Sequence, residues 1–299
     1  MKSLMEKLQA KEIVVFDGAT GTQLMKYGMP GGACPEALNL MQPDIPEQVA
    51  RDYQRAGADV VETNTFGGSP AKLAMHDYAE KTEDINKRAA EIARKGAGPD
   101  AFVAGSCGPT GEMLEPFGEA DPDTLYSGFV RQMQGLADGG VDLFCIETMS
   151  DLQEACLAVK AAKSVAPHIS VAATMTFNRS SRGFFTMMGV SVEAAAAGLE
   201  EAGADILGSN CGNGIEEMVE IAHVFAKITS LPLLIQANAG QPVLKNGRTH
   251  YPETPEFFAR HVEQMIHVGV GIIGGCCGTT PDHIRAIRGA VDAYQAKST

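Results

Sequence analysis

The stretch Glu201-Ala202-Gly203-Ala204-Asp205-Ile206-Leu207-Gly208-Ser209-Asn210-Cys211-Gly212 contains, in one place, the pattern that predicts the fold. Gly203 stands where a helical stretch ends, as glycine commonly does. The short apolar run that follows is typical of a buried strand, and a polar loop with a cysteine comes directly after it. This order of helix, glycine, strand and polar loop is the repeating unit of a parallel α/β fold.

The same joint of glycine and strand recurs at Gly57, at Gly139-Gly140 and at Gly269. Helical stretches separate the candidate strands throughout, and we find no signal for a two-residue hairpin. Eight strands favour a closed (β/α)8 TIM barrel over an open doubly wound sheet, and no linker divides the chain, so we expect one domain over residues 1–299. The candidate strands are residues 13–16, 59–63, 102–105, 142–146, 169–174, 205–208, 233–236 and 271–274.

Several helix starts support this alternation of strands and helices. The pairs Ser69-Pro70, Thr254-Pro255 and Thr280-Pro281 each place a capping hydroxyl before a proline that suits the first helical position. Ser150 with Gln153 predicts a further capping box. The long polar connection over residues 241–253 is expected to cover one end of the barrel.

Composition and charge exclude several classes of partner. The formal net charge is −13 and the pI is about 5.0, which repels phosphate backbones and anionic lipid, so we expect no nucleic-acid partner and no membrane partner. No stretch reaches the roughly 18 apolar residues that a membrane helix needs, and residues 1–10 do not resemble a leader. We therefore expect a cytoplasmic protein that binds small molecules or another protein.

Three cysteines follow predicted strands: Cys211 follows the sixth, and Cys276 and Cys277 follow the eighth. The carboxyl ends of barrel strands meet at one rim, so residues that lie 65 positions apart in the chain become neighbours there. Three thiolates suit a borderline-soft ion such as zinc, and three protein ligands leave one tetrahedral position open, as in catalytic zinc sites. A substrate thiol can take that position.

Simpler interpretations of these cysteines exist. A vicinal pair is often buried packing or a redox pair, and a glycine-rich loop after the eighth strand is commonly a phosphate site. The flanking Gly274, Gly275 and Gly278 favour a metal site because they let the backbone turn and direct both thiols to one side. Cys107 and Cys145 lack such a glycine-rich turn after their strands, so we assign them to packing in the core or at the rim of the barrel.

Taken together, the loops after the strands resemble those of the homocysteine S-methyltransferase family over residues 16–287. The resemblance is closer to the homocysteine-binding barrel of cobalamin-dependent methionine synthase than to betaine–homocysteine methyltransferase. The motifs that carry it are Asp17-Gly18-Ala19-Thr20-Gly21-Thr22, Asn64-Thr65-Phe66-Gly67, Gly108-Pro109-Thr110-Gly111, Glu147-Thr148, Asn210-Cys211 and Gly274-Gly275-Cys276-Cys277-Gly278.

The resemblance implies zinc held by Cys211, Cys276 and Cys277, with the homocysteine sulfur as fourth ligand. It also implies that Asp17 and Glu147 hold the substrate's amino group, while backbone N–H groups near Gly18 meet its carboxylate. The alternative is that Asp17 and Glu147 only cap their loops. Asn210 and Asn238 are assigned to orienting the cysteines or the substrate, with turn formation as the alternative. The seven histidines lie away from most strand ends, and none is a catalytic candidate.

The methyl donor is expected to come from outside the barrel, because no segment of this sequence resembles a corrinoid or folate module. A separate methyl-corrinoid protein carrying methylcobalamin is the first hypothesis, and S-methylmethionine or a similar small donor is the second. Residues 177–190 differ from the family pattern, which leaves open a corrinoid-linked methyltransferase that acts on another thiol or on a methylated substrate. A zinc-binding barrel without turnover is the non-enzymatic alternative.

Overall fold

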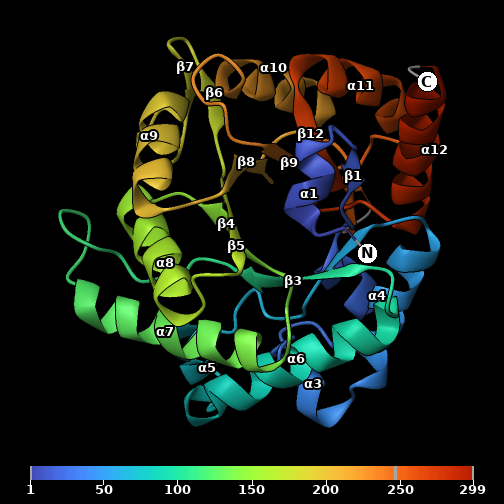
Figure 1. The fold of residues 1–299 in the computed structure, drawn as a ribbon. Coiled ribbons are helices and arrows are strands. Elements are labelled where there is room, and N and C mark those ends of the chain that lie inside the picture. The colour runs from blue at the N-terminus through green and yellow to red at the C-terminus, as the bar shows by residue number, and fades with distance from the viewer. Residues whose placement is uncertain (1, 246–247, 298–299) are drawn as a thin grey trace.

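A computed structural model describes residues 2–245 and 248–297, and its centre is a barrel of eight parallel strands (Figure 1). The sheet order is β1-β12-β9-β8-β5-β4-β3-β2, and Phe16 forms a parallel bridge with Val60 that joins its two ends. The predicted (β/α)8 barrel and all eight predicted strands are confirmed. The barrel strands are β1 (Val14–Val15), β2 (Val60–Glu62), β3 (Phe102–Cys107), β4 (Leu143–Met149), β5 (Ser170–Met175), β8 (Ile206–Asn210), β9 (Leu233–Ala237) and β12 (Val270–Gly275).

Most of the helices surround the barrel, while α1 lies across its centre (Figure 1), and none of those described is both long and apolar enough to cross a bilayer. They are α1 (Leu4–Gln9), α2 (Thr20–Lys26), α3 (Leu38–Met41), α4 (Asp44–Arg55), α5 (Pro70–Ala74), the 3-10 helix Ala79–Lys81, α6 (Thr82–Ala97), α7 (Pro122–Asp138), α8 (Leu152–Val165), α9 (Val192–Ala202), α10 (Ile215–Phe225), α11 (Pro255–Val268) and α12 (Pro281–Lys297).

The helix ends mostly follow the predicted signals. Ser69 caps α5 and Thr254 caps α11, each by accepting a hydrogen bond from a backbone N–H of the first turn. One glycine in each of the four joints adopts positive φ, from +83° at Gly140 to +107° at Gly269, whereas Gly139 has a φ of −82°. The predicted cap Ser150 is wrong: because β4 continues to Met149, the extended residue before α8 is Asp151, and its carboxylate accepts from Gln153 and Glu154.

Side chains inside the barrel change from apolar to polar along the strands. Towards the amino ends an apolar cluster fills the interior, and it includes Leu4 of α1. Because side chains alternate along a strand, the residue two positions after each buried interior residue points the same way. These following residues are polar on five strands, so the carboxyl end of the interior has a different chemistry. They are Glu62, Ser106, Glu147, Thr174 and Gln236.

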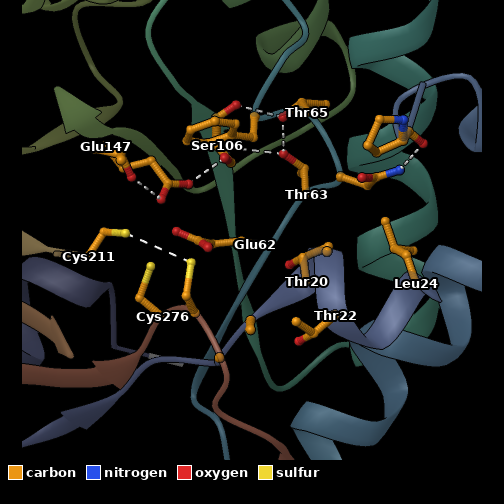
Figure 2. A pocket seen from close by; sticks show the side chains of 18 of the residues that line it. Thr20, Thr22, Leu24, Glu62, Thr63, Thr65, Ser106, Glu147, Cys211 and Cys276 are labelled. Carbon is orange, nitrogen blue, oxygen red and sulfur yellow. Dashed lines mark hydrogen bonds between the residues drawn. The ribbon is translucent and has the colours of Figure 1, made fainter. Parts of the chain in front are cut away.

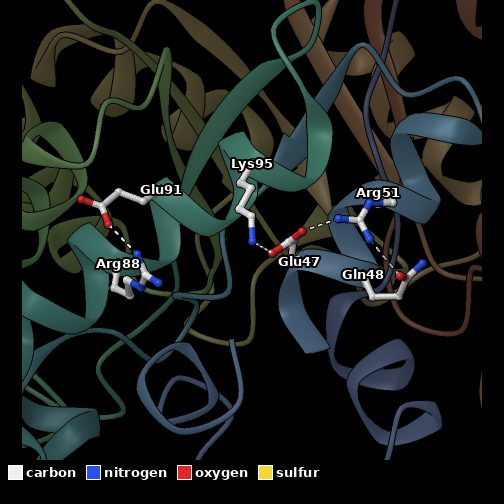
Figure 3. A network of polar contacts seen from close by, with 6 residues as sticks. All are labelled: Glu47, Gln48, Arg51, Arg88, Glu91 and Lys95. Carbon is white, nitrogen blue, oxygen red and sulfur yellow. Dashed lines mark hydrogen bonds and ion pairs between the residues drawn. The ribbon is translucent and has the colours of Figure 1, made fainter. Parts of the chain in front are cut away.

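Outside the barrel, a polar contact joins α4 to α6 (Figure 3). The buried carboxylate of Glu47 pairs with Arg51 one turn along α4 and accepts a 2.6 Å hydrogen bond from Lys95 of α6. The helices lie close here, since a Cβ built on Gly96 would lie 2.5 Å from the Glu47 carbonyl oxygen. The contact therefore fixes two neighbouring helices of the outer layer.

The expectation that the chain has no two-residue hairpin is wrong. The strands β6 (Asn178–Ser180) and β7 (Gly183–Phe185) form an antiparallel hairpin after β5, joined by two residues. Residues 178–180 are all exposed and therefore lack apolar alternation, while Gly183 supplies the turn with a φ of +119°. A second pair, β10 (Val243–Lys245) and β11 (Arg248–His250), lies within the predicted polar connection.

Replacing Gly208 with alanine tests how closely the barrel strands approach. A Cβ at this position would lie 1.7 Å from the Leu234 carbonyl oxygen of β9, so we expect Gly208→Ala to destabilise the fold by about 3 kcal/mol. Gly289→Ala is the matched control, because a Cβ at this position of α12 would meet no atom within 4 Å. This substitution should stabilise the fold by about 0.5–1 kcal/mol, since alanine favours a helix more than glycine does. Urea unfolding measures both, and a fully stable Gly208→Ala would contradict this packing.

Candidate active site

Three cysteine sulfurs meet at the carboxyl end of the barrel (Figure 2). Cys211 follows β8, and Cys276 and Cys277 follow β12, with β9 between these two strands. Their Sγ atoms all lie within 4.8 Å of one another, and the Cys211 and Cys277 sulfurs are 3.8 Å apart. The predicted convergence is therefore present, and a single metal ion could bind all three thiolates. Cys107 and Cys145 are buried elsewhere and are not part of this cluster.

The backbone around the cysteines shows what the glycines contribute. Gly278 adopts a φ of +81°, as the turn requires, and Cys211 itself adopts +62°, a conformation uncommon for a residue with a side chain. Gly274 and Gly275 have a different role from the predicted turn, because both still belong to β12. A Cβ on Gly275 would lie 2.4 Å from Thr279 Oγ1, so these glycines allow a close approach of neighbouring loops.

A pocket of about 350 Å³ opens beside the three sulfurs. Its wall includes the three cysteines, Gly18, Glu147 and two further carboxyl groups, Glu36 and Glu62. None of the described residues that line it is lysine, arginine or histidine. The protein therefore supplies negative charge and hydrogen-bond acceptors to this pocket, together with backbone groups of the 18–22 loop.

A network of hydrogen bonds fixes Glu147 in the wall. Ser106 Oγ donates to Glu147 Oε1 over 2.5 Å, and Asn210 Nδ2 donates to Oε2 over 3.0 Å. Asn210 Oδ1 accepts from the backbone N–H of Thr148 and from Thr174 Oγ1, so the amide orientation is set. The same Asn210 Nδ2 lies 3.9 Å from Cys276 Sγ. Asn210 thus links the carboxyl group to the sulfur cluster.

The loop after β1 is held against the loop after β12. The Asp17 carbonyl accepts from Gly275 N over 2.9 Å, and its buried carboxylate accepts from Glu62 N over 2.8 Å. Tyr53 is fully buried and its hydroxyl donates to the Ala19 carbonyl. A Cβ on Gly18 would lie 2.6 Å from Thr279 Oγ1, so only glycine fits between these loops.

The predicted site residues therefore occupy two layers. Gly18, Glu147 and the three cysteines line the pocket, whereas Asp17, Asn210 and Asn238 are buried behind its wall. Asn238 Oδ1 has no hydrogen-bond partner among the described residues. The sequence reasoning missed Glu62, because that residue lies inside the predicted strand 59–63 and only the residues after each strand were considered.

Burial controls the protonation of the carboxyl groups. Desolvation raises the pKa of Asp17 to about 8 and that of Glu147 to about 7, although hydrogen bonds from Ser106, Thr148 and Asn210 act against the shift at Glu147. The pKa of Glu62 is raised well above its ordinary value by burial and by the other two carboxyl groups. A bound cation would favour the charged forms.

The thiols share charge in a similar way. Hydrogen bonds from Cys276 and Cys277 lower the pKa of Cys211, while the pKa of each of the other two is raised by interaction with Cys211. One thiolate therefore forms readily, and the second and third require a compensating positive charge. Binding of a divalent metal would release the remaining thiol protons.

Comparisons with known proteins identify relatives of this chain. The sequence model of the homocysteine S-methyltransferase family matches residues 14–291. Methionine synthase of Mycobacterium leprae is 36% identical, over 96% of this chain and 25% of that protein. Methionine synthase of Mycobacterium tuberculosis is 35% identical, over 94% of this chain and 25% of that protein. The chain thus spans about a quarter of the length of these curated relatives.

A solved structure of similar size also matches. The metallated form of the homocysteine methyltransferase MmuM from Escherichia coli superposes with a TM-score of 0.78 at 25% identity. The match covers 94% of this chain and 97% of MmuM. The oxidized form of the same protein gives a TM-score of 0.79.

Metal analysis of cysteine variants tests the sulfur cluster. We expect Cys276→Ser to lower bound zinc well below one equivalent, because a neutral hydroxyl replaces one of three thiolate ligands. Cys156→Ser is the control, since Cys156 lies on α8 and its thiol contacts the Gly198 carbonyl, so zinc should remain. Undiminished zinc in Cys276→Ser would contradict the assignment.

The pH dependence of stability tests the burial of Glu147. Its pKa of about 7 exceeds the unfolded value of 4.5, so the folded state binds this proton more tightly and loses stability as pH rises through that range. Relative to the metal-free parent, the free energy of unfolding of metal-free Glu147→Gln should rise by about 2 kcal/mol between about pH 5 and about pH 8. Urea unfolding at both pH values measures the gain, and any constant cost of the new amide cancels. A pH-independent difference would contradict the prediction.

Proposed function

Since the chain belongs to the homocysteine S-methyltransferase family, we propose that it is a zinc-dependent enzyme that transfers a methyl group to homocysteine and forms methionine. The observation that carries this proposal is the meeting of three cysteine sulfurs beside a pocket walled by carboxyl groups. A thiol at one end of a ligand and an ammonium group at the other would match these two features.

The donor set fits zinc. Three thiolates within 4.8 Å of one another suit a borderline-soft ion and leave one tetrahedral position for a substrate sulfur. Zinc bound there would supply the acidity that keeps a substrate thiol deprotonated and nucleophilic near neutral pH. Asn210, next to Cys211 and close to the Cys276 sulfur, would orient the ligands through its fixed amide.

The wall of the pocket offers groups for both charges of an amino acid. Glu147, with Asp17 behind it, would bind the substrate ammonium group, because hydrogen bonds between charged partners are stronger than neutral ones. The N-terminus of α2 has no side-chain cap, so N–H groups of the 18–22 loop would bind the substrate carboxylate. Asn238, buried beside Cys211, would help to orient the site.

A separate methyl-corrinoid protein is our proposed methyl donor. The relatives named methionine synthase are about four times as long as this chain, so their additional polypeptide lies outside the matched barrel. The exposed side chains of Met25 and Phe66 line the pocket and offer apolar contacts to a large donor. All seven cysteines are free, as expected of a reducing compartment, and we place the reaction in the cytoplasm.

Methionine formation by the zinc-loaded protein tests the activity. We expect methylcobalamin and homocysteine to give methionine, and Cys276→Ser to lose at least roughly a hundredfold in rate through loss of a metal ligand. Homocysteine should also change the zinc X-ray absorption spectrum by adding a sulfur neighbour. An unchanged spectrum would contradict homocysteine as a zinc ligand. If methionine forms with S-methylmethionine but not with methylcobalamin, S-methylmethionine replaces the corrinoid as the proposed donor.

A further inference from the structure

Glu62 is a buried carboxyl group at the base of the pocket. It ends β2, follows the interior residue Val60 by two positions, and extends into the pocket between the sulfur cluster and Thr20 (Figure 2). Its Oε1 atom has no hydrogen-bond partner among the described residues, and neither has the Oδ1 atom of neighbouring Asp17. A buried acceptor without a partner is costly, so a donor that a ligand brings to the Glu62 carboxyl group, which lines the pocket, would offset that cost.

Other buried carboxyl groups of the chain show what a structural role looks like. Glu36 lies in the same pocket wall, and its two oxygens accept from Gly67 N and from Cys34 Sγ. Glu154 accepts from both the backbone N–H and the hydroxyl of Thr110. These groups are held by protein donors. Glu62 interacts with the Cys145 and Gln236 side chains, yet it lines the pocket and its buried Oε1 has no partner among the described residues.

The pocket wall carries no basic side chain among its described residues. Glu147 raises the pKa of both Asp17 and Glu62, and Asp17 raises that of Glu62, so the three carboxyl groups lie close together as one acidic group. A substrate ammonium group brings one positive charge and three N–H donors. Its donors suit the Glu62 and Glu147 carboxyl groups that line the pocket, and its charge offsets the repulsion between the carboxylates.

We infer that Glu62 binds the amino group of the substrate together with Glu147, with Asp17 buried behind them, and so selects amino-acid thiols over thiols that lack an amino group. This inference rests on the proposed function, because it names the recognition of the substrate at the same pocket. Glu62 acts in substrate binding and contacts the amino group. The three cysteines hold the metal to which the substrate sulfur would bind.

The experiment compares two thiols on the zinc-loaded protein by calorimetric titration. Homocysteine carries the amino group, and 4-mercaptobutanoate has the same carbon chain and carboxylate without it. Glu62→Gln removes the charge of the side chain but keeps its shape. It should therefore lower the affinity for homocysteine by roughly 10- to 100-fold and change the affinity for 4-mercaptobutanoate by less than about twofold. Zinc content should stay at the parent's value.

Glu36→Gln is the matched control, because it removes a carboxylate from the same wall whose oxygens already have protein partners. It should leave the ratio of the two affinities unchanged. Equal weakening of both thiols in Glu62→Gln, or an unchanged ratio while the parent binds homocysteine, would overturn the inference alone. A parent protein that binds neither thiol would overturn the proposed function and this inference with it.

Discussion

The parallel bridge between Phe16 and Val60 is the contact on which the site depends, because it joins β1 to β2 and closes the barrel. In an open sheet these strands would form opposite edges. Closure instead places Asp17 beside Glu62, where the carboxylate of one accepts from the backbone N–H of the other. It also directs all eight carboxyl ends towards one axis, which lets β8 and β12 present their cysteines to a common point.

Much of this could be predicted from sequence, since glycine joints and apolar runs have local causes. The strands, the barrel and the convergence of Cys211 with Cys276 follow from the chain itself. The caps and hairpins were harder: Ser150 was chosen over Asp151 because the end of β4 was placed too early, and the exposed residues 178–180 carry no apolar alternation.

Glu62 was missed for a related reason. Functional residues of a barrel are expected in the loops after the strands, yet the interior face of a barrel continues to the last strand residue. Counting by two from Val60 leads to Glu62, as counting from Cys145 leads to Glu147. The partners of Glu62 were beyond sequence reasoning in any case, because its free oxygen becomes apparent only once side chains from several strands are placed.

The electrostatics of the pocket give these residues a common purpose. The cysteines and carboxyl groups supply only negative charge, and burial makes that charge costly until cations arrive. A metal ion would offset the charge of the sulfurs, and an ammonium group would offset that of the carboxyl groups. Asn210 holds both halves at a fixed separation, since one amide contacts Glu147 and approaches Cys276. This arrangement suits the proposed ligand, which carries a thiol and an amino group a few bonds apart.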